Sequence, residues 1–273
     1  MKNNKLFNKQ VAKIIIDNFF ITFFLPLFFL ASILNIKKKE YYIFGSAPLI
    51  SNKYWSNAVK ELELKTITIM ETHYKSINEK DDFDLYFKDF IPKIIPDNIR
   101  TSLGRCFAFL FILQKGKVLH TSFYGFALND SFWWQLEGVL LKIARIKIIV
   151  IPFGGDAYDY SNINNISLKY GLLSSYGSGA NKASLIKKRI KYWTYFADVI
   201  IPGFMIDGLP KFDVIVPSPF NIDIKEWQCK KFFNKYDGIN NSIKILHTPN
   251  HREFKGTEFI IKAVEDLKEE GYL

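Results

Sequence analysis

The chain has 273 residues, 48% of them hydrophobic, which is enough to bury one large or two ordinary domains and excludes a disordered protein. Its formal net charge of +10 points to anionic membranes or phosphorylated ligands, although compositional bias in a source genome would also explain part of it. Nucleic acid is not expected as a partner, because no zinc-finger or RNP signature occurs. Cys106, Cys229 and the four histidines form no ligand motif, so a reduced cytoplasmic setting without a metal is expected.

Residues 1–39 form a hydrophobic segment flanked by cations. The apolar run Phe19–Leu34 is shorter than the roughly 20 residues of a spanning helix, and Pro26 is expected to kink it. A cleaved signal peptide is disfavoured because no small-residue cleavage site is present. The sequence predicts a helix associated with the inner face of the cell membrane, with a full span or a helix buried in the protein as alternatives. The flanking lysines are Lys2, Lys5, Lys9, Lys13, Lys37, Lys38 and Lys39.

The next stretch reads as a strand, a helix and a strand. Tyr41–Phe44 and Lys65–Met70 have the composition of strands. Such a βαβ unit prescribes a parallel sheet, and the loop Gly45–Ser51 is expected either to face the ligand crevice or to be a plain connection. No dinucleotide-binding or Walker-type glycine motif occurs. The helix between the strands is predicted from caps and apolar spacing at Ser51, Asn52, Trp55, Ala58, Val59 and Leu62.

Further helices and strands alternate up to Pro152. An acidic, irregular stretch at Ser76–Pro96 carries no predicted chemistry. The run Lys147–Pro152 is continuously apolar, as expected for a strand buried on both faces. The pattern predicts the α/β class, with one Rossmann-like domain over residues 40–225. The other elements expected here are helices near Gly104–Leu113 and at Phe132–Arg145, and a strand at Lys117–His120.

Two of these strands end in candidate site residues. His120 ends its strand and is a candidate catalytic residue, with a structural role as the alternative. Phe153 is followed by Gly154 and Gly155, which allow close backbone approach to a sugar or phosphate, and by Asp156, whose carboxylate can accept hydroxyl hydrogen bonds. The alternative is a tight turn in which Asp156 caps local backbone groups.

The following segment is predicted as a flexible loop, Ser174–Asn181, and a basic helix, Lys182–Phe196. The cations of this helix are expected to form a solvated face, with contact to lipid phosphates as the alternative. Strands are predicted at Ala197–Pro202 and Phe212–Pro217, and residues 226–242 read as a linker. The cations are Lys187, Lys188, Arg189 and Lys191.

The C-terminal residues 243–273 read as a strand, a basic turn and a helix. The strand is Ile243–Leu246, and the turn contains Arg252, Lys255 and Gly256 before Thr257 as the predicted N-cap. Free backbone N–H groups, a helix dipole and two cations suit a diphosphate, with solvated loop charges as the alternative. The helix carries an apolar stripe at Ile260, Ala263, Val264 and Leu267 and is predicted to end at Gly271.

Three blocks carry a resemblance to retaining glycosyltransferases of the GT-B fold, the family 4 type. They are Phe153–Asp156, Pro217–Asp223 and, most specifically, Ile245–Gly271. The resemblance implies a complete N-terminal Rossmann-like domain, on the acceptor side, and the first β-α unit of a second, donor-binding domain that the chain leaves incomplete. It assigns Arg252, Lys255, Gly256 and Thr257 to the donor diphosphate and places Gly154 and Gly155 so that they face the donor site across the cleft, with His120 and Asp156 as catalytic candidates. The chain differs from the family pattern in two respects. The spacing between Arg252 and Lys255 is shorter than in many members, and Phe153 occupies a position where the family commonly has His.

The function implied by the resemblance is transfer of a sugar from a nucleotide-sugar to a glycan or lipid-linked acceptor, in surface polysaccharide or glycolipid biosynthesis. No metal is implied, because cations and a helix N-terminus stabilise the leaving diphosphate in this fold. A paired-Glu donor motif of the family lies further downstream than Leu273, so truncation is expected. The alternatives are a non-catalytic membrane-associated binding module or split-gene remnant, and a nucleotide-sugar epimerase.

Overall fold

Six parallel strands form the central sheet of the described structure, in the order β3-β2-β1-β4-β5-β6. The computed structural model describes residues 2–34, 38–74, 78–175, 177–216, 222–228, 245–249, 252 and 255–272. This strand order is that of a doubly wound, Rossmann-like sheet, so the predicted α/β class is confirmed. The strands are β1 (Tyr41–Ser46), β2 (Thr66–Met70), β3 (Leu85–Tyr86), β4 (Gly116–Thr121), β5 (Lys147–Val150) and β6 (Val199–Ile200).

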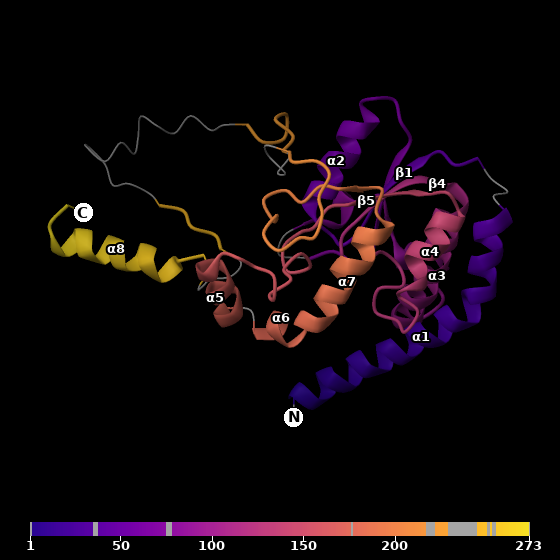
Figure 1. Ribbon diagram of the computed structural model, residues 1–273, viewed down its shortest axis with the longest axis horizontal. Coiled ribbons are helices and arrows are strands. Elements are labelled where there is room, and N and C mark those ends of the chain that lie inside the picture. The colour runs from indigo at the N-terminus through magenta and orange to yellow at the C-terminus, as the bar shows by residue number, and fades with distance from the viewer. Residues whose placement is uncertain are drawn as a thin grey trace.

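Helices cover both faces of the sheet (Figure 1). One face carries α2 (Ile50–Lys60), and the other carries α3 (Asp97–Lys115), α4 (Leu136–Ile143) and α7 (Ala183–Phe196). A long N-terminal helix, α1 (Lys2–Leu34), packs outside α3 and α4. The remaining helical elements are η1 (Lys80–Asp82), η2 (Phe87–Phe90), α5 (Ile166–Ser175), α6 (Gly177–Asn181) and α8 (Thr257–Glu269).

One face of α1 belongs to the core of the domain. Ile21 and Phe28 are fully buried, and the Phe28 ring meets Phe109 of α3 edge-on at 5.1 Å between centroids. The opposite face exposes large apolar side chains. The segment Val11–Leu34 is long and apolar enough to cross a membrane. Core helices of soluble proteins can have the same length and composition. The most exposed side chains of this outer face are Ile15, Phe19, Phe23, Leu30 and Ile33, between 52% and 70% accessible.

The helix predicted between the first two strands is confirmed as α2, but its N-cap is Leu49 and not Ser51 or Asn52, and its buried side chains are not those of the apolar series. Leu62 lies beyond the helix and is 69% exposed, whereas the polar Asn52 and Ser56 are buried together with Tyr54. The reason is a specific contact, because the Asn52 side-chain amide donates a 2.9 Å hydrogen bond to the Ala47 carbonyl. A satisfied polar group can therefore occupy the inner face of the helix.

The predicted loop Ser174–Asn181 is also wrong in its described residues, which belong to α5 and α6. Leu172 of α5 is 2% exposed and packs with Tyr160 and Ile163 in a small apolar cluster. Burial of this side chain favours helix where the local Ser and Gly content favours a loop. The predicted basic helix is confirmed as α7, but Arg189 is not solvated: it is 7% exposed and its guanidinium lies 4.2 Å from the Tyr124 ring centroid.

Two predicted strands do not form in the described residues. Residues 212–216 form no strand, because the Asp213 carboxylate accepts the N–H of Ile200 at 2.9 Å, the edge donor that a further strand would use. Ile245 and Leu246 also form no strand and are 62% and 87% exposed. Residues 243–244, the segment 217–221 and most of the predicted linker lie outside the described residues.

Candidate functional site

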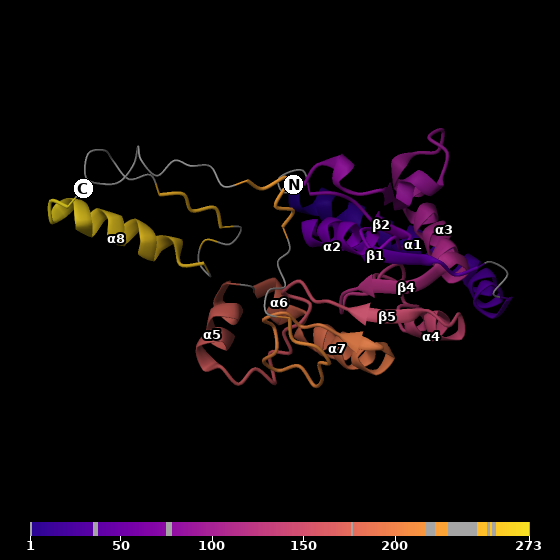
Figure 2. The ribbon, with the colours of Figure 1, turned by 90° about the horizontal axis from the view of Figure 1, so that it is seen from above.

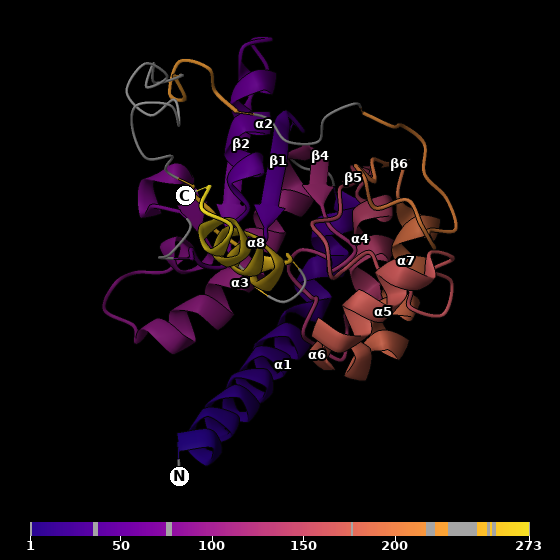
Figure 3. The same cartoon turned by 90° about the vertical axis from the view of Figure 1, so that its left-hand side faces the viewer.

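The sheet has a topological switch point between β1 and β4, where the strand order reverses. Ligands of open α/β sheets bind at such points, outside the carboxyl ends of the strands. Figure 2 shows β4 and β5 pointing toward the side on which α5 and α6 lie, and Figure 3 looks onto that side. A narrow crevice of about 10 Å³ lies at the switch point. Its lining residues are Gly45, Ala47, Leu49, Asn52, Trp55, His120, Thr121, Ser122 and Ile151.

The end of β1 and the loop that follows it are packed closely at this crevice. Gly45 has φ +154°, and a Cβ there would lie 1.9 Å from the Ile69 carbonyl oxygen, so only glycine fits beside β2. The Asn52 amide donates a 2.9 Å hydrogen bond to the Ala47 carbonyl, and the Asn78 amide donates a 2.7 Å hydrogen bond to the Pro48 carbonyl. The predicted crevice-facing loop Gly45–Ser51 thus lies at the switch point with its backbone held in place.

His120 lies at the end of β4 and lines the crevice. Its ring stacks on Phe44 of β1 at 4.1 Å between centroids, and β4 and β1 pair at these same two residues. Burial lowers the pKa of His120 to about 4, so the imidazole is neutral at physiological pH. Its buried Nδ1 has no hydrogen-bond partner in the described structure. A neutral imidazole has one N–H donor and one acceptor nitrogen, so through its Nε2 it can exchange a single hydrogen bond with a ligand hydroxyl.

Asp156 organises the turn after β5. Its carboxylate accepts backbone N–H groups of Phe153 at 2.9 Å, Gly154 at 3.1 Å and Phe123 at 3.1 Å. Burial raises the pKa of Asp156 to about 6, against the opposing effect of these hydrogen bonds. The described contacts correspond to the predicted local cap. Gly154 and Gly155 leave open space, because a Cβ at either position would meet nothing within 4 Å.

The basic turn precedes α8, which Figures 1 and 2 show apart from the sheet. Arg252 is exposed and pairs with Glu258 at 3.2 Å. Gly256 has φ +69° and is the N-cap, so the prediction of Thr257 in that role is wrong by one residue. The Thr257 hydroxyl instead lies 2.9 Å from the ring Nε2 of His247. A left-handed N-cap favours glycine, which explains the one-residue shift. Lys255 lies in the same turn and is exposed.

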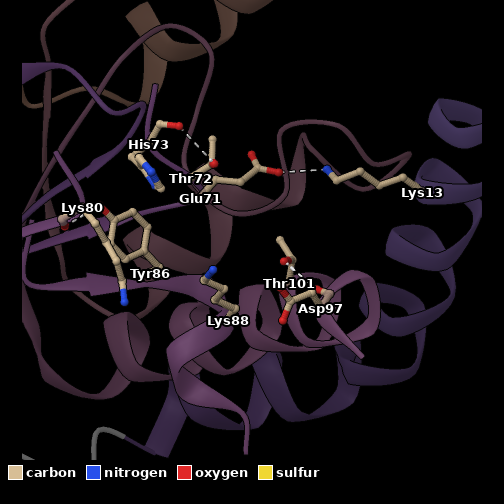
Figure 4. Close-up of a pocket in the computed structure, with 9 residues that line it drawn as sticks. All are labelled: Lys13, Glu71, Thr72, His73, Lys80, Tyr86, Lys88, Asp97 and Thr101. Atoms are coloured by element: carbon tan, nitrogen blue, oxygen red, sulfur yellow. Dashed lines mark hydrogen bonds and ion pairs between the residues drawn. The ribbon is translucent and has the colours of Figure 1, made fainter. Parts of the chain in front are cut away.

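A second cavity, larger than the crevice at the switch point, lies at the ends of β2 and β3 (Figure 4). It was not predicted from the sequence. Its volume is about 330 Å³, and it is lined by Lys13, Glu71, Thr72, His73, Lys80, Tyr86, Lys88, Asp97 and Thr101. The sequence contains a pattern that could have predicted this cavity. Glu71, Thr72 and His73 directly follow a buried strand, and the candidate site residues His120 and Gly154–Asp156 were chosen because they lie at such strand ends. Lys80 and Lys88 come from the stretch to which no chemistry was assigned.

A buried charge network links this cavity to α1. Arg105 of α3 is inaccessible to solvent and contacts the Glu71 carboxylate at 2.6 Å and the Asp17 carboxylate of α1 at 3.7 Å. Lys13 of α1 contacts the same two carboxylates at 2.8 Å and 3.3 Å. The network fixes the position of α1 beside the carboxyl edge of the sheet.

Comparison of the chain with protein-family models, curated proteins and solved structures gives no match.

Proposed function

We propose that the chain is the acceptor-side domain and the first part of the donor-binding domain of a GT-B-type retaining glycosyltransferase. The observation that carries this proposal is the parallel sheet with a neutral His120 and the open Gly154–Gly155 turn at its carboxyl edge. The basic turn at the start of α8 supplies the complementary part of a nucleotide-sugar site. The helix dipole and the cations of this turn suit the diphosphate, whereas the Thr257 and Phe259 N–H groups already donate to the Arg252 and Gly256 carbonyls.

Each of these residues is assigned a role. In this proposal Lys255, Gly256 and the N-terminus of α8 stabilise the negative charge that develops on the departing nucleoside diphosphate. His120 exchanges one hydrogen bond with a sugar or acceptor hydroxyl. Asp156 positions the Phe153–Gly155 turn by binding its N–H groups. A metal is not part of the proposal, because cationic groups of the chain supply the electrostatic stabilisation.

Replacing Lys255 with alanine is expected to weaken binding of a nucleotide-sugar about tenfold or more, because a charge-assisted contact to the diphosphate is lost. The measurement is calorimetric titration of the purified chain with a panel of uridine and guanosine diphosphate sugars. Lys262→Ala is the matched control, since Lys262 is also exposed and lies on α8, the helix that follows the turn. Equal affinities for all three proteins would contradict the assignment of the basic turn.

Turnover separates the proposed transferase from the other functions. Transfer of a labelled sugar to a membrane extract, with the anomeric configuration retained, supports the transferase. Conversion of the donor without an acceptor indicates an epimerase. Binding of the donor with no turnover of any kind indicates a binding module.

The proposal also includes association with an anionic membrane through the outer face of α1. The helix cannot leave the domain easily, because both of its halves are tied to it: the Phe132 N–H donates to Asn18 at 2.8 Å, and Gln114 donates to the Ala31 carbonyl at 2.6 Å. The exposed apolar face therefore lies along the domain surface, as in a helix that lies in the membrane interface. Phe132, 83% exposed, extends this surface beside Phe19 and Phe23. Lysines near both ends of α1 suit anionic headgroups.

The double variant Phe19→Ser/Phe23→Ser is expected to partition into anionic vesicles at least about tenfold more weakly, since each phenylalanine loses about 1.5–3 kcal/mol of apolar transfer free energy. Flotation with phosphatidylglycerol-containing vesicles measures this partition. Ile166→Ser/Tyr170→Ser is the control, because it removes exposed apolar side chains from α5. If both double variants float like the wild type, α1 does not bind membranes through this face.

A further inference from the structure

The cavity of Figure 4 collects polar groups from both sides of the sheet edge. Lys13 enters it from α1, Glu71 and His73 from the end of β2, and Lys88 and Thr101 from η2 and α3. Its volume of about 330 Å³ is in the range of small-molecule sites, unlike the narrow switch-point crevice. The cavity is therefore the larger ligand space of the two at the carboxyl edge.

The anionic side chains of the cavity are already compensated. Burial raises the pKa of Glu71, but Arg105 and Lys13 oppose it and hold the pKa below its usual value, so Glu71 remains ionised. It contacts Arg105 at 2.6 Å and Lys13 at 2.8 Å. Asp97 is mostly exposed and pairs with Arg100 at 2.8 Å. Neither carboxylate is left to neutralise a further cation.

Two cations of the cavity have no such compensation. Within the described part of the chain, the ammonium groups of Lys80 and Lys88 form no ion pair. Figure 4 shows Lys88 directing its ammonium group into the cavity between Tyr86 and Thr101, with Lys80 beside Tyr86. The hydroxyl groups of Thr72 and Thr101 line the same space but already donate to the backbone carbonyls of His73 and Asp97. Uncompensated ammonium groups around a cavity are the chemistry that binds phosphate oxygens.

The cavity also lies against the helix whose outer face suits a membrane. Lys13 contacts Glu71 from α1, and only two residues further along, Ile15 is 63% exposed on the outer face. Positions two residues apart lie on opposite faces of an α-helix, so a headgroup at the membrane surface would lie one helix diameter, roughly 10 Å, from the cavity when α1 rests in the interface.

We propose that this cavity binds the phosphate or diphosphate group of a membrane-anchored acceptor, with Lys80 and Lys88 as its main cationic contacts. This rests on the proposed function, and it names the acceptor class as a lipid-linked phosphate or diphosphate. Free phosphate or pyrophosphate presents the same oxygens, so the test separates the two sources.

The test uses the full chain and the double variant Lys80→Ala/Lys88→Ala. One arm titrates inorganic pyrophosphate by calorimetry in the Lys255→Ala background, so that the proposed diphosphate site before α8 does not contribute to the measured binding. The other measures flotation with phosphatidylcholine vesicles, with and without phosphatidic acid as the phosphate monoester lipid. The control Lys60→Ala/Lys191→Ala removes two exposed lysines from α2 and α7, and Lys80→Arg/Lys88→Arg keeps both charges. Thermal melting of each variant confirms that it is folded.

We expect the alanine variant to bind pyrophosphate at least about tenfold more weakly and to lose the gain in flotation that phosphatidic acid gives, while the control and the arginine variant keep both. Loss of pyrophosphate binding with an intact phosphatidic acid effect would overturn the lipid source and leave a free-phosphate site. Equal behaviour of the alanine variant and the control in both arms would overturn the site. Binding of neither probe by the wild type would overturn it as well.

The outcome is independent of the donor test. The Lys80→Ala/Lys88→Ala variant is expected to bind the nucleotide-sugar like the wild type, because Lys255 is unchanged. Failure of donor binding beside intact pyrophosphate binding would contradict the proposed function and leave the cavity as an anion site.

Discussion

Replacing Phe28 with alanine is expected to lower the free energy of unfolding by about 3–5 kcal/mol. Phe28 is fully buried between α1 and α3, where its ring contacts Phe24 at 6.0 Å and Phe109 at 5.1 Å between centroids. Removing the ring loses apolar burial and leaves a cavity that packed helices cannot close completely. Urea unfolding followed by circular dichroism measures the change.

The matched control is Phe23→Ala, five residues earlier on the same helix. Phe23 is 70% exposed, so its removal is expected to change stability by no more than about 0.5 kcal/mol. A similar loss for both variants would mean that the inner and outer faces of α1 are wrongly assigned. A negligible loss for Phe28→Ala would mean that α1 is not an integral part of the core.

Replacing Arg105 with methionine is expected to cost about 3–5 kcal/mol at neutral pH, because it leaves the buried Asp17 carboxylate and the partly buried Glu71 carboxylate with less compensating charge. Methionine keeps most of the apolar stem, so the effect reports on charge more than on volume. Arg105 is inaccessible to solvent and also donates to Asn129 at 3.3 Å. The free energy of unfolding in urea at several pH values is the measurement.

The pH dependence has a defined sign. Since Arg105 and Lys13 hold the pKa of Glu71 below its ordinary value of 4.5, the stability from this ion pair is present above that value and is lost as the pH falls. The difference in the free energy of unfolding between the wild type and Arg105→Met should therefore become smaller as the pH falls below about 4.5. Lys65→Met is the control, because its pair with Glu40 is solvated and should contribute little. A pH-independent difference would show that packing, and not charge, makes Arg105 important.

The candidate site was predictable in part. Alternating strands and helices imply a parallel sheet, and carboxyl ends of parallel strands share one edge, so His120 and the Gly154–Asp156 turn were correctly placed at that edge. The cavity at the end of β2 was missed although the same rule applies to Glu71 and His73. Its other groups, Lys13 and Lys88, come from segments far apart in sequence, and no local pattern predicts their convergence.

Buried charges were the least predictable feature. Arg189 reads as part of a solvated basic face, yet it packs on the Tyr124 ring. Glu137 reads as an ordinary helix residue, yet it is fully buried and accepts backbone N–H groups of Phe126, Ala127 and Leu128 at 2.6 to 3.1 Å. Burial of a charge depends on partners that only the folded chain brings within hydrogen-bond distance.

The sequence by itself determined the α/β class, the positions of the strands from β1 to β6 except β3, and the apolar character of α1, because these depend on local composition and on periodicity. Only the tertiary structure decided which face of α1 enters the core, where Leu85–Tyr86 pairs as β3, and why a strand at residues 212–216 does not form. These outcomes depend on contacts between distant residues, such as Phe28 with Phe109 and Asp213 with Ile200. Such contacts outweigh local secondary-structure preferences of a few tenths of a kcal/mol. They cannot be predicted from any single stretch of the sequence.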